Sequence, residues 1–252
     1  MNTVAHNALS KVPAVTLMFW IVKIAATTLG ETGGDAVSMS MQLGYLVATG
    51  VFAVVFLIAV AAQIGAKRYQ PWLYWTTIIA TTTVGTTLAD YADRSLGIGY
   101  AGGTTLLFTL LMVSLAVWYR TLGTVSADSV STPKSEAFYW VTIMFSQTLG
   151  TALGDWTAST AGLGYTGGAA VFSVLLALVV VAYYRTSISH TALFWAAFIL
   201  TRPLGAVVGD FLDKPIDAGG LALSRYTASA VLLLFIAGCL WLFPQKAASK
   251  VH

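Results

Sequence analysis

Four aspartates occupy equivalent positions within apolar stretches of this sequence, where charge is uncommon. Each follows a glycine by five residues and a tryptophan by fifteen, and the four are Asp35, Asp90, Asp155 and Asp210. Ionised groups are costly to bury, so such side chains normally face one another or a water-filled space inside the protein. Carboxylates that converge there bind hard cations such as Mg²⁺ and Mn²⁺, or carry protons.

Other polar residues share the helical face of these aspartates, because positions four and eight residues earlier lie on the same side of a helix. Glu31 is the only acid four residues before a motif aspartate, and Arg202 occurs only in the fourth copy. We expect Arg202 to pair with Glu31 or another acid. The predicted cation ligands are Glu31, Asp35, Asp90, Asp155 and Asp210. The predicted cavity lining is Thr27, Thr82, Thr86, Gln147, Thr151 and Arg202.

The acids also have a structural explanation, in which each aspartate hydrogen-bonds a neighbouring helix pair at the outer surface. When Asp90, Asp155 and Asp210 are considered without Glu31 and Asp35, the structural and the functional explanations account for them equally well. Three further acids are interpreted as solvated loop charges: Asp93, Asp213 and Asp217. Lys23 lies three residues after Trp20, which favours a side chain that reaches the cytoplasmic surface.

The composition is that of an integral membrane protein. Of the 252 residues, 57% are hydrophobic and 9% are charged, and the mean hydropathy is +0.78. A soluble domain has about 25% charged residues. A membrane-spanning helix needs about 20 apolar residues. Eight runs have this character: 13–35, 43–65, 72–92, 98–119, 137–157, 164–184, 191–212 and 222–243.

The aspartate motif recurs four times in tandem, with copies that begin at Trp20, Trp75, Trp140 and Trp195. Each copy contains two predicted helices joined by a short loop. We therefore expect an all-α fold of eight transmembrane helices, arranged as four parallel hairpins. Small residues four apart, such as Gly30 and Gly34, allow close helix approach, so the odd-numbered helices are predicted to form an inner bundle. The motif tryptophans are expected at the membrane interface.

Basic residues indicate the orientation of the chain. Eight lie at the termini or between hairpins, and three lie in the loops within hairpins. Under the positive-inside rule, this places both termini in the cytoplasm. A polar linker at 124–136 divides the sequence into two halves, 1–123 and 137–252, with two repeats in each.

The repeat array resembles an uncharacterised family of bacterial multi-pass membrane-anchored proteins. The first copy reads KVPAVTLMFWIVKIAATTLGETGGD (11–35), and three similar copies follow it. The resemblance covers nearly the whole chain. It implies a location in the inner membrane of a bacterium, and it implies no activity, cofactor or site residue.

These features favour a small secondary transporter of an inorganic cation. A divalent ion such as Mn²⁺ or Mg²⁺ is preferred, with exchange against protons as one form of coupling. The alternatives are a sensor or scaffold module whose acidic stripes are structural, or a channel with the same lining. We expect no enzyme activity and no cofactor besides the cation, because the sequence has one cysteine, three histidines and no nucleophile–base pair. The expected partners are the lipid bilayer and the cation, without nucleic acid, and a homodimer remains open.

Overall fold

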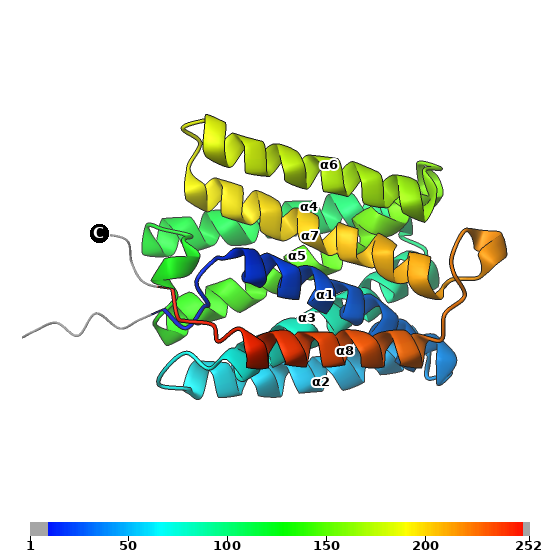
Figure 1. The fold of residues 1–252 in the computed structure, drawn as a ribbon, viewed down its shortest axis with the longest axis horizontal. Coiled ribbons are helices and arrows are strands. Elements are labelled where there is room, and N and C mark those ends of the chain that lie inside the picture. Colours follow the sequence, from blue (N-terminus) through cyan, green and yellow to red (C-terminus); the bar gives the residue numbers. More distant parts are fainter. Residues whose placement is uncertain (1–9, 249–252) are drawn as a thin grey trace, which may run out of the picture.

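The computed structural model describes residues 10–248, which form eight long helices joined by short connections (Figure 1). The helices are α1 (Leu17–Asp35), α2 (Gly44–Gly65), α3 (Pro71–Asp90), α4 (Gly99–Leu122), α5 (Pro133–Asp155), α6 (Gly164–Arg185), α7 (His190–Asp213) and α8 (Arg225–Leu242). The expectation of an all-α fold with eight helices is confirmed, and each helix lies within a few residues of a predicted apolar run.

Local sequence explains several helix boundaries. Thr16 caps α1 by accepting a hydrogen bond from the backbone N–H of Phe19, and Thr132 forms a reciprocal capping box with Ser135 at the start of α5. Glycines with φ near +70° begin the return helices α2, α4 and α6, at Gly44, Gly99 and Gly164. Glycine adopts this left-handed region without steric cost, which accounts for the glycine found nine residues after each motif aspartate.

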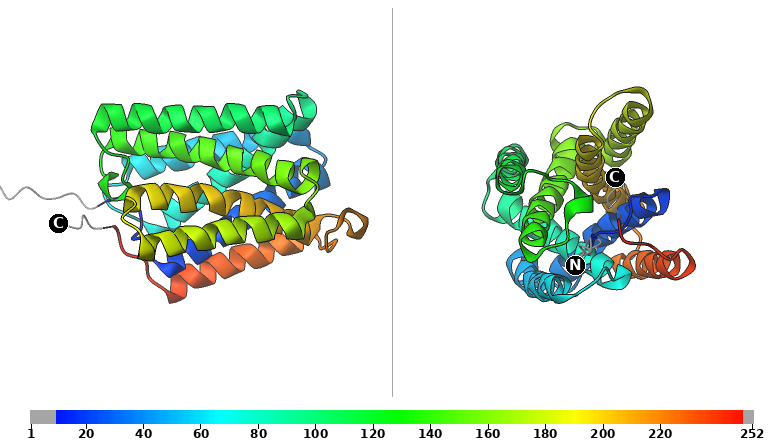
Figure 2. Two further views of the ribbon diagram at one scale, coloured as in Figure 1. Left: turned by 90° about the horizontal axis from the view of Figure 1, so that it is seen from above. Right: turned by 90° about the vertical axis from the view of Figure 1, so that its left-hand side faces the viewer.

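The odd-numbered helices form a closed ring at the centre of the molecule. α1 packs against α3, α3 against α5, α5 against α7, and α7 against α1. The even-numbered helices lie around the outside of this ring, as the end-on view of Figure 2 shows. The predicted inner bundle is therefore present.

The four inner helices run side by side in one direction. Near their starts, the hydroxyl of Tyr74 on α3 hydrogen-bonds the hydroxyl of Tyr139 on α5. At their ends, Asp35 of α1 is ion-paired with Lys214, which directly follows α7. We call the first of these ends the aromatic end and the second the acidic end.

The outer helices pack differently from simple hairpins. The return helix of each repeat covers the first helix of the next repeat, so that α2 packs on α3, α4 on α5, and α6 on α7. α8 completes the cycle by packing on α1. Successive repeats are therefore interlocked, and the two halves of the sequence share one ring.

The motif glycines allow the inner helices to approach closely. A Cβ atom added at Gly85 of α3 would meet the backbone of Gln147 on α5, and one at Gly205 of α7 would meet the backbone of Thr27 on α1. The side chains of Thr82 and Arg202 occupy the same position against the other two motif glycines. The small-residue pairs thus bring the helices together as predicted, because a larger side chain would collide with the neighbouring helix.

Within residues 10–248, five helices are long and apolar enough to cross a membrane, namely α2, α4, α6, α7 and α8. The remaining three, α1, α3 and α5, have similar lengths but carry many polar residues. Those polar residues are mostly buried inside the ring, where the outer helices shield them. These properties indicate that the protein associates with a membrane.

Three of the four motif tryptophans do not lie in the interfacial belt that the sequence predicts, and the fourth, Trp20, is half-buried. Trp75, Trp140 and Trp195 are at most 4% exposed and pack with Phe19, Tyr74 and Tyr139 inside the aromatic end. They are buried because they lie on the inner helices, where other helices surround the position.

The described chain ends meet at the aromatic end. The backbone N–H of Ala14 donates to the carbonyl of Lys246, and that of Ala248 donates to the carbonyl of Val12. Gln245 accepts a hydrogen bond from the indole of Trp75. These hydrogen bonds join the segment before α1 and the aromatic end of α3 to the segment after α8.

Candidate functional site

The inner ring stacks equivalent residues of the four repeats in layers along its axis. One layer follows the motif glycines directly and consists of Glu31, Thr86, Thr151 and Ala206. The layer below it consists of Thr27, Thr82, Gln147 and Arg202. The layer above it holds the four motif aspartates. All of these side chains are buried.

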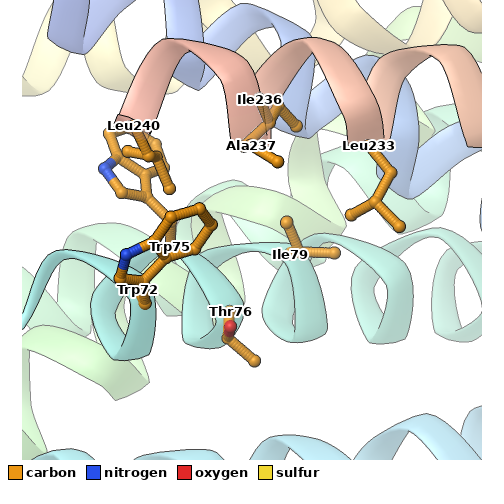
Figure 3. A pocket seen from close by; sticks show the side chains of 8 residues that line it. All are labelled: Trp72, Trp75, Thr76, Ile79, Leu233, Ile236, Ala237 and Leu240. Atoms are coloured by element: carbon orange, nitrogen blue, oxygen red, sulfur yellow. The ribbon is translucent and has the colours of Figure 1, made fainter. Parts of the chain in front are cut away.

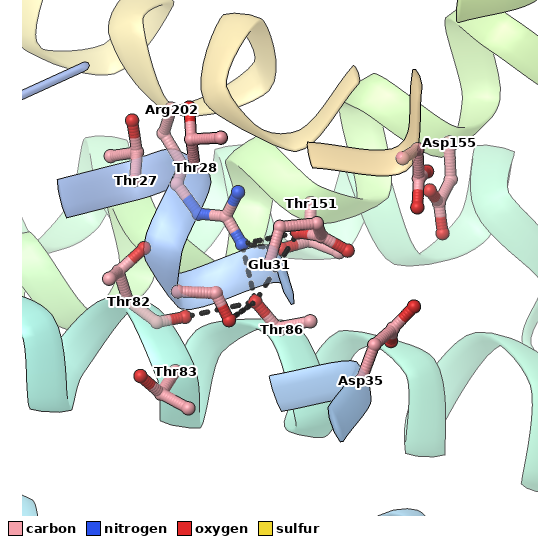
Figure 4. A network of polar contacts seen from close by, with 12 residues as sticks. Thr27, Thr28, Glu31, Asp35, Thr82, Thr83, Thr86, Thr151, Asp155 and Arg202 are labelled. Atoms are coloured by element: carbon pink, nitrogen blue, oxygen red, sulfur yellow. Dashed lines mark hydrogen bonds and ion pairs between the residues drawn. The ribbon is translucent and has the colours of Figure 1, made fainter. Parts of the chain in front are cut away.

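Arg202 and Glu31 form an ion pair at the centre of the ring (Figure 4). Arg202 Nη2 lies 2.9 Å from Glu31 Oε2 and 2.7 Å from Thr86 Oγ1, and it also donates to Thr151 Oγ1. Ala206, the layer residue of α7, is too small to reach this centre, and Arg202 extends one layer upward to fill the space. The pairing expected for Arg202 is therefore present.

Only one guanidinium nitrogen of Arg202 takes part in this network. Nε and Nη1 have no hydrogen-bond partner among residues 10–248, although the side chain is fully buried. In Figure 4 all dashed lines at Arg202 converge on a single nitrogen. Thr82 Oγ1 and both polar atoms of Gln147 in the same layer likewise have no partner within that part of the chain.

Three of the five predicted cation ligands come together at the acidic end. Glu31, Asp35 and Asp210 each place one carboxylate oxygen within 4.8 Å of the other two, and all three residues are buried. Two come from α1 and one from α7, so the packing of the first inner helix on the last creates the group. Carboxylate oxygens at this spacing suit a hard cation such as Mg²⁺ or Mn²⁺.

A lysine ammonium group holds two members of this carboxylate triad. Lys214 Nζ is ion-paired with Asp35 and lies 2.9 Å from Asp210 Oδ1. Burial lowers the pKa of Lys214, but the charges of Asp210 and Asp35 outweigh that effect and raise its pKa above the ordinary value. Two carboxylates of the triad therefore share the ammonium group of Lys214.

A second cation borders the triad. Arg225 Nε lies 2.9 Å from Asp213 Oδ2 and 3.8 Å from Asp35 Oδ2. The other oxygen of Asp35, Oδ1, is buried and has no hydrogen-bond partner within 10–248. The triad therefore keeps an acceptor that its neighbouring cations leave unused.

The other two predicted ligands, Asp90 and Asp155, form a separate cluster around Arg94. Arg94 lies 3.1 Å from Asp90 Oδ1 and 2.9 Å from Asp155 Oδ2. It also donates to the hydroxyls of Tyr45 and Tyr100. Arg94 thus joins side chains of four helices, α2 to α5, and forms ion pairs with two acids that the sequence placed in the cation site.

The roles of Arg94, Lys214 and Arg225 were not predicted from the sequence, where these residues indicated only the orientation of the chain. Two of them carried a recognisable signal. Arg94 follows Asp90 by four residues, and Lys214 follows Asp210 by four, which is the spacing of ion pairs on a helix. No comparable local signal marks Arg225, because its partner Asp213 lies across a loop.

Two predictions about charged residues are wrong. Lys23 does not reach the surface: it is 0% exposed, with its ammonium 3.4 Å from Thr201 Oγ1 and over the ring of Phe198. Asp93 and Asp213 are buried rather than solvated, because the return helices cover the acidic end. Burial raises the pKa of Asp93 to about 6, against the lowering effect of Arg94.

A small hollow on the surface is unrelated to these charges (Figure 3). It has a volume of about 60 Å³ and lies between α3 and α8, toward the aromatic end. Its lining is almost entirely apolar and includes Trp72, Trp75, Ile79 and Leu240. It offers no ligand for a cation.

The fourfold internal repetition agrees with a known sequence family. A family model described as a repeat of unknown function (DUF347) matches residues 18–69, 73–124, 138–189 and 193–246. The chain belongs to this family. Each DUF347 match starts two residues before a motif tryptophan and spans one inner and one outer helix. No curated protein and no solved structure matches the chain.

Proposed function

We propose that this protein transports an inorganic cation across a membrane, with a divalent ion of the Mn²⁺ or Mg²⁺ type as cargo and protons as the coupling ion. The observation that carries the proposal is the convergence of Glu31, Asp35 and Asp210 inside a bundle of membrane-length helices. Acids at such depth are rare unless they serve an ion or proton pathway.

The charge balance of the acidic end supports a cation. Seven carboxyl groups are buried in this half of the ring: Glu31, Asp35, Asp90, Asp93, Asp155, Asp210 and Asp213. Four cationic side chains accompany them, namely Arg94, Arg202, Lys214 and Arg225. Protons or a bound cation can neutralise the excess of negative charge. Exchange of a cation for protons would use both.

In this proposal Lys214 acts as a tethered substitute for the transported ion. Its ammonium group pairs with Asp35 and Asp210 in the state described here. An incoming cation displaces Lys214 and takes the carboxylates of the triad. Thr86 and Thr151 supply neutral oxygens beside Glu31, and Arg202 holds Glu31 while no cation is bound. Asp90 and Asp155 add negative charge at the entrance.

We also propose that all eight helices span the inner membrane of a bacterium, as four parallel repeats with both termini in the cytoplasm. The excess of Lys and Arg at the termini and between repeats supports this orientation. It places the acidic end outside and the packed aromatic end toward the cytoplasm. Transport then requires the packed aromatic side chains of the aromatic end to separate, so that the cation can pass between them.

The test is flux of Mn²⁺ and Mg²⁺ into liposomes that contain the purified protein. We expect Asp35→Asn to abolish flux and Lys214→Gln to raise the apparent affinity for the cation, because it removes the competing ammonium. Asp217→Asn is the matched control, since Asp217 is exposed and should behave as wild type. Wild-type protein that moves neither ion nor protons would overturn the proposal.

A non-transporting scaffold or sensor is the second candidate function, and the Arg94 cluster favours it. Arg94 pairs two motif aspartates from different repeats and binds two tyrosine hydroxyls, as expected of an architectural device. A scaffold would show no ion flux, and Asp35→Asn would then alter stability alone.

A further inference from the structure

Two cationic side chains are buried below the carboxylate triad, and only one acid accompanies them. Lys23 and Arg202 are both 0% exposed. Glu31 is ion-paired with Arg202, whereas Lys23 has no carboxylate within ion-pair distance among residues 10–248. Its polar contacts there are the 3.4 Å approach to Thr201 Oγ1 and the ring of Phe198. Lys23 is therefore a fully buried basic side chain without an acid to pair with in that part of the chain.

The polar atoms around these cations are mainly unused donors. Arg202 Nε and Nη1, the Thr82 hydroxyl and the Gln147 amide have no partner in the part of the chain described. Charged and polar groups in an apolar interior need partners, because their hydration has been removed. Gln147 Oε1 is an unpaired acceptor in the same group, and the Thr82 hydroxyl can donate or accept. The N–H donors of Arg202 and Gln147 outnumber these acceptors, which favours an acceptor as their partner.

The helix packing places these groups at one level of the ring. Thr82 lies against Gly30 of α1, Gln147 against Gly85 of α3, and Arg202 against Gly150 of α5. Lys23 approaches from one turn below on α1, and its ammonium contacts Thr201, the residue before Arg202 on α7. Donors from four different inner helices thus surround the axis between the aromatic end and the Arg202–Glu31 pair.

We propose that a small monovalent anion, such as chloride, binds in this layer between Lys23 and Arg202. The anion neutralises Lys23 and accepts hydrogen bonds from Arg202, Gln147 and Thr82. This site adjoins the carboxylate triad at Arg202, which pairs with the triad's Glu31 through Nη2 and offers Nε and Nη1 to the anion. The proposal does not depend on cation transport.

Thermal unfolding of the purified protein in detergent tests this site, in sodium chloride, bromide or gluconate at constant ionic strength. The two halides should raise the unfolding temperature saturably relative to gluconate, an organic anion much larger than either halide. Lys23→Met should require an at least about tenfold higher halide concentration for half of the effect. The exposed Lys67 provides the control variant, Lys67→Met, with an unchanged halide response.

A second variant and a direct probe keep the test decisive if Lys23→Met fails to fold. Gln147→Leu keeps both positive charges and should weaken the halide response by a smaller factor. Crystals grown in bromide should show anomalous scattering in contact with Lys23 Nζ and Arg202. The proposal is overturned if wild-type stability is the same in all three salts, if the variants respond as wild type does, or if bromide is found on the surface alone.

Discussion

The two ends of the inner ring are built from the same four helices but are held together by different forces. At the aromatic end, each repeat contributes rings at equivalent positions, such as Tyr74 and Tyr139, and the burial of their apolar surface stabilises the packing without requiring charged partners. At the acidic end, several carboxylates form ion pairs, and the cation often belongs to another repeat, as Arg94 does for Asp155. Ring packing permits four similar copies, whereas charge pairing requires the copies to differ.

The copies differ most where the two ends meet. Glu31 occurs in the first repeat alone and Arg202 in the fourth alone, and the closed ring brings them into contact. A linear array would keep these two residues apart. The residues that the repeats share therefore build the helix ring, while residues found in a single repeat form its central ion pair.

The comparison predicts its largest effect at the central ion pair. Arg202→Met leaves Glu31 buried and unpaired, which should lower the free energy of unfolding by about 3–5 kcal/mol. The double variant with Glu31→Gln should recover part of this loss, because no unpaired charge remains. Reversible unfolding in mixed micelles measures both. A double variant that is less stable than Arg202→Met alone would contradict the pairing.

The next effect concerns the close packing that both ends share. A Cβ at Gly205 would meet the backbone of Thr27, so Gly205→Ala should cost about 1–3 kcal/mol of stability. Gly238→Ala on α8 is the matched control, because nothing lies within 4 Å of the added atom. The same unfolding assay compares the two, and equal stabilities would exclude tight packing at the motif glycine.

A smaller effect is expected at the aromatic end. Tyr74→Phe removes the 2.6 Å hydrogen bond to Tyr139 but keeps both rings, so the expected loss is about 0.5–1.5 kcal/mol. Tyr184→Phe is the control, since Tyr184 is 75% exposed. A loss as large as that of Arg202→Met would show that the aromatic end also depends on polar contacts.

The smallest effect is a pH dependence at the acidic end. Burial raises the pKa of Asp93 from 3.8 to about 6, so the folded state binds its proton more tightly than the unfolded state. The stability contributed by this proton is complete below about pH 3.8 and is lost as the pH rises through about 6. Asp93→Asn should flatten the unfolding temperature between these values. An unchanged pH profile would mean that Asp93 titrates normally.

The helices and the inner ring were predictable from sequence because they depend on local patterns. Apolar length gave the helix positions, and glycine pairs such as Gly30 and Gly34 gave the inner faces. The division of the acids into a triad and an Arg94 cluster was not predictable, because it depends on which repeats become neighbours. The burial of Lys23 and Trp75 was missed for a related reason: the interface explanation assumes a lipid-facing helix, and both residues lie on the inner ring.

The cyclic cover of each inner helix by the previous repeat has a consequence for biosynthesis. α8 is synthesised after the other seven described helices, and it covers α1, which is synthesised before them. The polar face of α1 therefore stays without its final neighbours, α7 and α8, until translation of the fourth repeat is complete. Truncated nascent chains that lack this repeat should consequently be substrates for membrane quality-control proteases.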